Sequence, residues 1–173
     1  MGAGSVSTAV ADAGPLIRLH EIGALHLLAF IDQLHVPDAV WHEVHALGAG
    51  TAPPLETFDN LIRRRLNDDS VKQFIHRHSL EHLHLGEQES LYVCQEEAIG
   101  LLLTDDLAVR TAAIELNIRP VGSLGVIVRA YRIEALTLGE ARQAIRSLQD
   151  VSSLFVTNAI VEQAILLLEE DAS

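Results

Sequence analysis

The sequence predicts an α/β fold in which a central, mainly parallel sheet is covered by helices on both faces. Short apolar runs typical of buried strands alternate with longer segments whose apolar residues recur at helical spacing. The chain has 173 residues, of which 49% are apolar, so one domain with a sizeable core is expected. We predict a single domain over residues 1–173, with a helical C-terminal extension at about 134–173.

The first half of the chain predicts two strand–helix units followed by a polar helical region. The β-rich stretch "SVSTAVA" leads into Asp12-Ala13-Gly14-Pro15, where Pro15 suits the first turn of a helix. The predicted elements are a strand at 5–11, a helix at 16–31 interrupted at Gly23, a strand at 34–36, a helix from Pro37 to about Leu47, a loop at 48–54 and polar helical material at 56–84.

The second half predicts two further strands and then helices to the end of the chain. Asn117 is expected to end a helix in the left-handed conformation. The predicted elements are a helix from Gly86 to about Ala98, a strand at 101–104, a helix from about Asp106 to Leu116, a strand at 118–121, a Gly-bracketed turn at 122–125 and helical segments beyond it.

Composition excludes several classes of protein. The formal net charge of −12 has the wrong sign for holding nucleic acid by bulk electrostatics. Either the partner is not a polyanion, or metal ions or a basic partner offset the acidity. The single cysteine, Cys94, excludes a disulfide framework and a multi-cysteine zinc site. With no apolar run of membrane-spanning length and no signal-peptide pattern at the N-terminus, a cytoplasmic protein is expected.

Carboxylates follow two of the predicted strands. Asp12 comes directly after the first strand, and Asp105 and Asp106 come directly after the strand at 101–104. Ligands of parallel α/β sheets bind beyond the carboxyl ends of the strands. The sequence therefore predicts an acidic site at this edge of the sheet.

Helical phase adds glutamates to this group. Glu43 lies about 60° from the centre of its helix's apolar stripe. Glu87 is in phase with the apolar residues of its own helix, whereas Glu89 falls on the opposite face and is expected to be solvated. A core-facing glutamate is costly unless it is paired or binds a metal. Convergence of Asp12, Glu43, Glu87 and Asp106 would form an all-oxygen site suited to Mg²⁺ or Mn²⁺, which supports phosphodiester hydrolysis.

Three segments resemble the PIN (PilT N-terminus) family of metal-dependent ribonucleases, in particular its VapC-like branch of toxins from toxin–antitoxin pairs. They are "VADAGPLIRLHEIGALHLL" (10–28), "HVPDAVWHEV" (35–44) and the stretch 85–130, which contains "LGEQES" and "LLLTDDLAVR". The resemblance implies a PIN-like three-layer α/β/α sandwich and a Mg²⁺- or Mn²⁺-dependent endoribonuclease acting on RNA. It also implies a small antitoxin partner and a homodimer, for which the apolar helix at 159–168 offers surface; that helix could equally pack on the sheet.

The resemblance also implies the site residues. Asp12 matches the aspartate of the first strand and Glu43 the glutamate after the "P-x-x-V-x-x-E" turn. The "G-E-x-E" helix start offers Glu87 or Glu89, of which helical phase favours Glu87. The "T-D-D" strand end offers two aspartates, and the family pattern favours Asp106 as the ligand, with Asp105 as a helix cap or a ligand through water.

Five further residues are candidates for contact with nucleic acid. Arg110 has the spacing of a helix-surface ion pair with Asp106 and can alternatively meet a phosphate. Ser123, in "GSLG", is either a turn serine or a phosphate contact. The densest basic patch is either a solvated helix face or an RNA backbone contact, and comprises Arg63, Arg64 and Arg65.

Two other classes of function compete with the nuclease. One is a catalytically silent PIN-like module that binds protein. The other is a phosphoacceptor receiver domain, which also places an acidic pair at strand ends. Receivers need a lysine at a later strand end, and the single lysine, Lys72, precedes the Asp105–Asp106 strand, which argues against a receiver.

Overall fold

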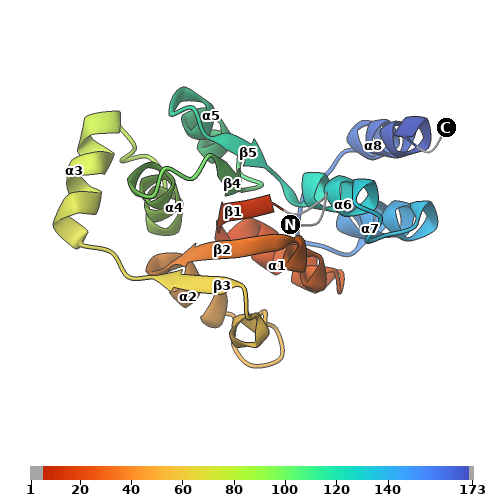
Figure 1. Cartoon of the computed structure of the whole chain (residues 1–173), viewed down its shortest axis with the longest axis horizontal. Coiled ribbons are helices and arrows are strands. Elements are labelled where there is room, and N and C mark those ends of the chain that lie inside the picture. Colours follow the sequence, from red (N-terminus) through yellow and green to blue (C-terminus); the bar gives the residue numbers. More distant parts are fainter. Residues whose placement is uncertain (1–5, 172–173) are drawn as a thin grey trace.

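The computed structural model describes residues 6–171, in which five parallel strands form one central sheet (Figure 1). The strand order is β3-β2-β1-β4-β5, so the chain moves outward from β1 in one direction and then in the other. This order creates a topological switch point between β1 and β4. The strands are β1 (Val6–Ala11), β2 (Ile31–Pro37), β3 (Leu61–Arg64), β4 (Leu101–Leu103) and β5 (Arg119–Val121).

Helices connect the strands and complete the chain. The α-helices are α1 (Ala13–Glu21), α2 (Asp38–His45), α3 (Asp68–His78), α4 (Leu85–Glu96), α5 (Leu107–Glu115), α6 (Ser123–Arg132), α7 (Leu138–Asp150) and α8 (Asn158–Asp171). Two 3₁₀ helices are η1 (Leu25–Phe30) and η2 (Leu55–Thr57). No helix among residues 6–171 is long and apolar enough to cross a membrane.

Two apolar cores cover the two faces of the sheet. Successive strand residues alternate between them: Ala9 and Ala11 of β1 pack in the core formed with α1, α2 and α6–α8, while Val10 packs in the core formed with α3–α5. Leu101 and Leu103 of β4 likewise face the first core and Leu102 the second. This period of two confirms the predicted parallel sheet covered on both faces and gives the three-layer α/β/α sandwich.

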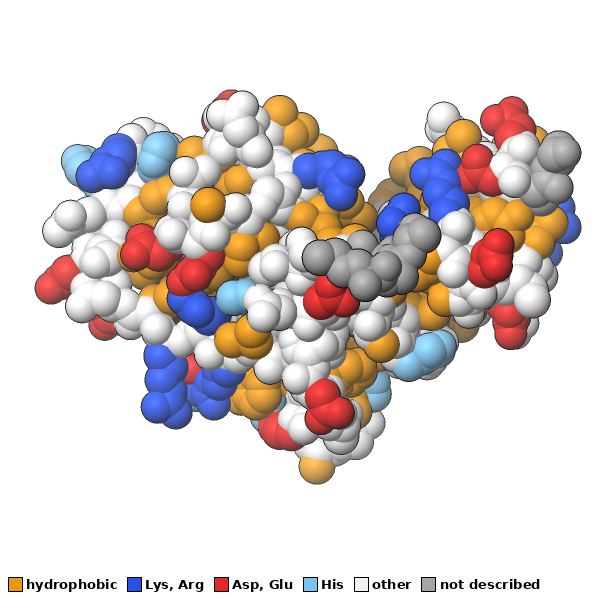
Figure 2. All heavy atoms as spheres, in the orientation of Figure 1, with side chains coloured by type: hydrophobic (Ala, Val, Ile, Leu, Met, Phe, Trp, Pro, Cys, Tyr) orange, Lys and Arg blue, Asp and Glu red, His pale blue; other side chains and the backbone are white. Residues whose placement is uncertain are grey.

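The last three helices form an arm at one side of the sheet (Figure 1). Thr137 caps α7 through a capping box with Glu140, and one face of α7 and α8 packs into the first core. The opposite side of α8 leaves Ile160, Leu166 and Leu167 exposed. Figure 2 shows a notch between this arm and the rest of the molecule. The predicted C-terminal helices are thus present, with α7 beginning at Leu138.

The prediction that residues 56–84 are helical throughout is wrong for the first part of this region. Residues Leu61–Arg64 form β3, which pairs in parallel with β2 at the edge of the sheet. Arg63 and Arg64 therefore lie on a strand and not on a helix face. Pairing with β2 decides this conformation, and such tertiary pairing is invisible in the local run of charged residues. The remainder of the region contains helix α3, as predicted.

Several boundaries also differ from the prediction. The interruption at Gly23 is confirmed, with a positive φ of 70° after α1 ends. Strand β2 is longer than the predicted 34–36 and begins at Ile31. The predicted turn at 122–125 is instead the start of α6, because Gly122 is its N-cap and Ser123 its first residue. Ser5, the predicted first strand residue, lies outside the described residues.

Candidate active site

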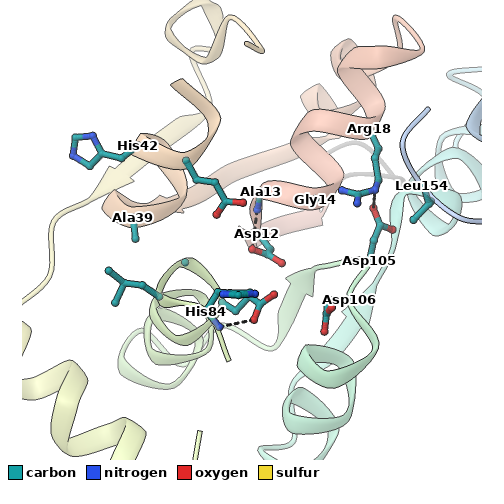
Figure 3. A pocket seen from close by; sticks show the side chains of 14 residues that line it. Asp12, Ala13, Gly14, Arg18, Ala39, His42, His84, Asp105, Asp106 and Leu154 are labelled. Carbon is teal, nitrogen blue, oxygen red and sulfur yellow. Dashed lines mark hydrogen bonds and ion pairs between the residues drawn. The ribbon is translucent and has the colours of Figure 1, made fainter. Parts of the chain in front are cut away.

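An acidic cavity of about 670 Å³ opens at the carboxyl ends of β1 and β4, at the topological switch point of the sheet (Figure 3). Helices α1, α2 and α4 and the segment between β4 and α5 border it, and Leu154, from the segment between α7 and α8, also lines it. Five carboxylates line the cavity: Asp12, Glu43, Glu87, Asp105 and Asp106. The structure therefore brings together the four predicted ligands and one of the two secondary candidates.

Asp12 lies at the centre of the site and is only 5% exposed. Its backbone N–H donates to Leu103 O (3.0 Å), which fixes the end of β1 against β4. One carboxylate oxygen accepts from the Ala13 N–H at the start of α1 (2.8 Å), and the other accepts from the Thr104 hydroxyl (3.0 Å). The pKa of Asp12 is raised to about 6, chiefly by burial and to a smaller extent by the charges of Glu87 and Glu43, although its hydrogen bonds to Ala13 and Thr104 lower it.

Asp105 and Asp106 diverge, and the helix-cap role expected of Asp105 belongs to Asp106. Asp106 caps α5, because its carboxylate accepts from the N–H groups of Ala108 (2.8 Å) and Val109 (3.0 Å). Asp105 turns instead toward α6 and accepts from both the backbone N–H (2.7 Å) and the hydroxyl (2.6 Å) of Ser123. The expectation failed because α5 begins at Leu107, which leaves Asp106 in the extended cap conformation.

Of the two glutamates at the start of α4, Glu87 faces the cavity and Glu89 does not. The Glu87 carboxylate accepts from the His84 N–H (2.8 Å) in a capping box, and burial raises its pKa. Glu89 accepts from the Ala39 N–H in the first turn of α2 (2.8 Å), and burial raises its pKa as well. The expectation that Glu89 is solvated is therefore wrong: it anchors α2 against α4.

Glu43 reaches the cavity from α2, in an exposed position. A Cβ built on Gly86 would lie 3.2 Å from the nearer Glu43 carboxylate oxygen. The absence of a side chain at Gly86 therefore lets α2 and α4 approach closely, which places Glu43 beside the start of α4.

Helix N-termini hold four of the five carboxylates. Asp12 caps α1, Glu87 completes the box of α4, and Asp106 caps α5. Asp105 binds the first N–H of α6. The positive end of each helix dipole stabilises the nearby negative charge, by roughly 0.3–1 kcal/mol at exposed sites. This arrangement offsets part of the repulsion that would otherwise oppose gathering these groups.

The residues present fit a hydrated divalent cation. In the described chain, no three carboxylate, imidazole or thiolate groups lie close enough together to hold one ion directly. Mg²⁺, however, usually keeps several waters and binds one or two carboxylates directly. The donors are all oxygens, and the pKa of Asp12 is raised first by burial and then by the charges of Glu87 and Glu43, so a cation in the cavity would stabilise its ionised form.

The weaker nucleic-acid candidates lie outside the cavity lining. Arg110 donates to the Thr104 backbone carbonyl (3.3 Å). Ser123 is fully buried and gives both its donors to Asp105, so it holds a carboxylate instead of offering a phosphate contact. Arg63 pairs with Asp38 (2.5 Å) and Arg64 with Glu97.

Three polar residues of the cavity were not predicted: Arg18 on α1, His42 on α2 and His84, which precedes α4. The described lining residues include no other arginine and no lysine. A signal for Arg18 existed in its spacing, four residues after Gly14, because helical side chains lean toward the N-terminus. That signal was hidden by the apolar pattern of the same helix.

The doubly wound sheet and the carboxylates at its switch point define an α/β protein with an acidic, cation-compatible site. A family model described as a PIN domain matches residues 8–170, nearly the whole chain, and the protein therefore belongs to the PIN domain family. PIN domains are generally nucleases and typically use divalent metal ions. The comparison with curated proteins found no match.

Proposed function

We propose that this protein is a Mg²⁺- or Mn²⁺-dependent endoribonuclease that hydrolyses RNA phosphodiester bonds. The observation that carries the proposal is the set of five carboxylates around one cavity at the switch point of the sheet. The PIN family assignment supports the same class of chemistry. The proposed ligands of the ion are Asp12, Glu43, Glu87 and Asp106. Asp105 is proposed to bind the ion through water.

The proposed role of each side chain follows from how firmly the structure holds it. A bound divalent ion supplies an activated water and charge stabilisation at the phosphate. Asp12, fixed by Ala13 and Thr104, provides a rigid carboxylate at the centre. Glu43 is exposed at the edge of the cavity, so it suits the removal of a proton from the attacking water.

We further propose that the protein is the toxin of a toxin–antitoxin pair. The resemblance of its motifs to VapC-like proteins supports this role, and so does the open acidic cavity. A small antitoxin would cover the cavity, with an arginine meeting the carboxylates. The exposed apolar side of α8, at Ile160, Leu166 and Leu167, supports a homodimer contact. Cell growth arrest on expression, relieved by a neighbouring small protein, tests the toxin role.

Cleavage of labelled single-stranded RNA by the purified full chain tests the nuclease. We expect cleavage with Mn²⁺ or Mg²⁺, none with chelator, and a loss of at least about 100-fold for Asp12→Asn. Asp32→Asn is the matched control, because Asp32 is an exposed aspartate on β2 that does not line the cavity. Cleavage by Asp12→Asn at the wild-type rate would contradict the assignment of this cavity as the ribonuclease active site.

A catalytically silent module that binds protein is the second candidate. The observation that favours it is that no three ligating groups among residues 6–171 stand together as the side chains lie. Calorimetric titration with Mn²⁺ separates the two: binding at or below millimolar concentration, lost in Asp12→Asn, supports the nuclease. Absence of binding supports the silent module.

A further inference from the structure

We propose that Arg18 binds a phosphate of the RNA and holds it beside the carboxylates of the cavity. The inference rests on the proposed ribonuclease function and adds to it a substrate-binding residue. It depends on three features of α1: the charge that Arg18 brings to the cavity, its unused hydrogen-bonding capacity and the space that Gly14 leaves for it.

The first feature is charge. Five carboxylates line the cavity. Among the described residues that line it, Arg18 is the only arginine, and there is no lysine. A phosphodiester is an anion, so an acidic cavity repels it unless cations face it from more than one side. Arg18 supplies a permanent positive charge on the side of the cavity formed by α1 and Asp105 (Figure 3).

The second feature is that no hydrogen bond ties the Arg18 Nε to the protein. Nε lies 4.0 Å from the nearer Asp105 oxygen, which is beyond hydrogen-bonding distance, and it has no other hydrogen-bond partner among the described residues. Asp105 already accepts two hydrogen bonds from Ser123. The guanidinium is therefore attracted to Asp105 by charge without being fixed by it, and it can turn toward an incoming anion.

The third feature is the space above the first turn of α1. Gly14 lines the cavity, and a Cβ built on it would lie 3.1 Å from Arg18 Nη1 and 3.7 Å from Asp105 Cβ. The backbone of Gly14 is ordinary helix, which any residue can adopt. The close approach of Arg18 and Asp105, and not the backbone conformation, therefore explains why a glycine occupies this position. The lack of a side chain lets the guanidinium lie close to this turn, beside Asp105.

Together these features describe a guanidinium that is charged, incompletely hydrogen-bonded and placed at the wall of the candidate active site. Arginine presents a planar pair of donors that matches two phosphate oxygens. A phosphate here would accept a hydrogen bond from the guanidinium, whose Nε has no hydrogen-bond partner among the described residues, while the carboxylates across the cavity face the ion. Arg18 thereby orients the RNA backbone and does not itself exchange a proton.

Kinetics of RNA cleavage with Mn²⁺ test the proposal in the full chain. We expect Arg18→Ala to raise KM about tenfold with a smaller change in kcat. Loss of one phosphate contact should also reduce the slope of log affinity against log salt by about 0.7 for a single strand. Mn²⁺ affinity should stay within about twofold of wild type, and Arg18→Lys should recover part of the KM.

Gly14→Ala gives an independent test that leaves Arg18 in place. The added Cβ crowds Nη1, so we expect KM to rise in the same direction as in Arg18→Ala. The matched control is Gly139→Ala on α7, where a Cβ meets nothing within 4 Å, and its kinetics should equal those of wild type.

The outcomes separate this inference from the function on which it rests. An unchanged KM and salt slope in both Arg18→Ala and Gly14→Ala, with wild-type cleavage intact, overturns the role of Arg18 alone. A drop in Mn²⁺ affinity and melting temperature with an unchanged salt slope also overturns it, because Arg18 would then only support Asp105. Failure of the wild-type chain to bind or cleave RNA overturns both proposals.

Discussion

Asp12 is the residue at which packing and charge conflict most strongly. It is 5% exposed and accepts hydrogen bonds from Ala13 and Thr104, yet burial raises its pKa to about 6. The folded protein therefore holds a proton on Asp12 more tightly than the unfolded chain does. A cation in the cavity would stabilise the ionised form of Asp12. The stability of the protein should therefore depend on the charge of Asp12 and on whether a cation is bound.

The first prediction concerns the pH dependence of stability without metal. Because the folded pKa of Asp12 lies above its unfolded value of 3.8, its contribution to stability is fully present below that value and is lost as the pH rises through about 6. The change amounts to on the order of 3 kcal/mol. About half of this change, roughly 1.4 kcal/mol, falls between pH 5 and pH 8. Urea unfolding with chelator at these two pH values should show that loss in wild type and a smaller one in Asp12→Asn. Equal losses in both proteins would contradict it.

Asp106→Asn separates the two roles of Asp106. Asparagine caps helices about as well as aspartate, so the free energy of unfolding should change by less than about 0.5 kcal/mol. Loss of the charge should nevertheless weaken Mn²⁺ binding, which calorimetry measures. Wild-type Mn²⁺ affinity in this variant would remove Asp106 from the ligand set.

The roles of individual site residues that could not be predicted from the sequence depend on contacts between distant segments of the chain. The positions of Asp12 and the aspartate pair at strand ends are local features, and the sequence was sufficient to locate them. Which aspartate caps α5 depends on one residue of helix phase and on Ser123, which binds Asp105 from α6. Arg18 was overlooked because its approach to Asp105 joins segments that are distant in the chain.

At the scale of elements, the site is a meeting point of helix N-termini. The starts of α1, α4, α5 and α6 each hold a carboxylate of the cavity. Each such carboxylate thus contributes to folding as a helix partner and to the proposed chemistry as a negative charge. Conservative amide substitutions separate these two contributions, as in the Asp106 prediction.

Packing of α6 against β5 gives an element-scale prediction about stability. A Cβ on Gly125 would lie 2.8 Å from Val121 Cγ1, so Gly125→Ala should destabilise the fold by about 1–3 kcal/mol. Gly139→Ala is the control, because its position on α7 is open and alanine is the better helix former; it should stabilise by about 0.5–1 kcal/mol. Denaturant unfolding measures both. A neutral Gly125→Ala would refute the close packing of α6 on β5.

The elements themselves were predictable to different degrees. Buried strands β1 and β4 carry their own apolar signal, and so do the helices that pack on the two cores. Strand β3 does not, because its partner β2 supplies the pairing that holds Arg63 and Arg64 in extended backbone. The order of the strands, which creates the switch point, likewise depends on contacts between distant segments.

At the scale of the whole molecule, the net charge of −12 is partly concentrated around one cavity. Arg63 and Arg64 of the predicted basic patch do not offset it, because each is paired with its own acidic neighbour. We therefore propose that a divalent ion and Arg18 supply the positive charge that attracts the RNA backbone to the cavity.

Thermal unfolding should report the metal in the intact chain. Mn²⁺ at about 100 times its Kd stabilises the folded state by about 2.7 kcal/mol, if the unfolded chain does not bind it. For a protein of this size that corresponds to a rise of roughly 5–10 °C in Tm. The rise should be lost in Asp12→Asn and absent with a monovalent salt at equal ionic strength. A similar rise in Asp12→Asn would place the ion elsewhere.

An anomalous difference map from crystals grown with Mn²⁺ would show directly whether the cavity carboxylates hold a divalent cation. We expect a manganese peak in the cavity, with Asp12 among its ligands and Glu43, Glu87 or Asp106 contacting it directly or through water. A map with no peak in the cavity at millimolar Mn²⁺, or with a peak only at a distant surface site, would contradict this expectation.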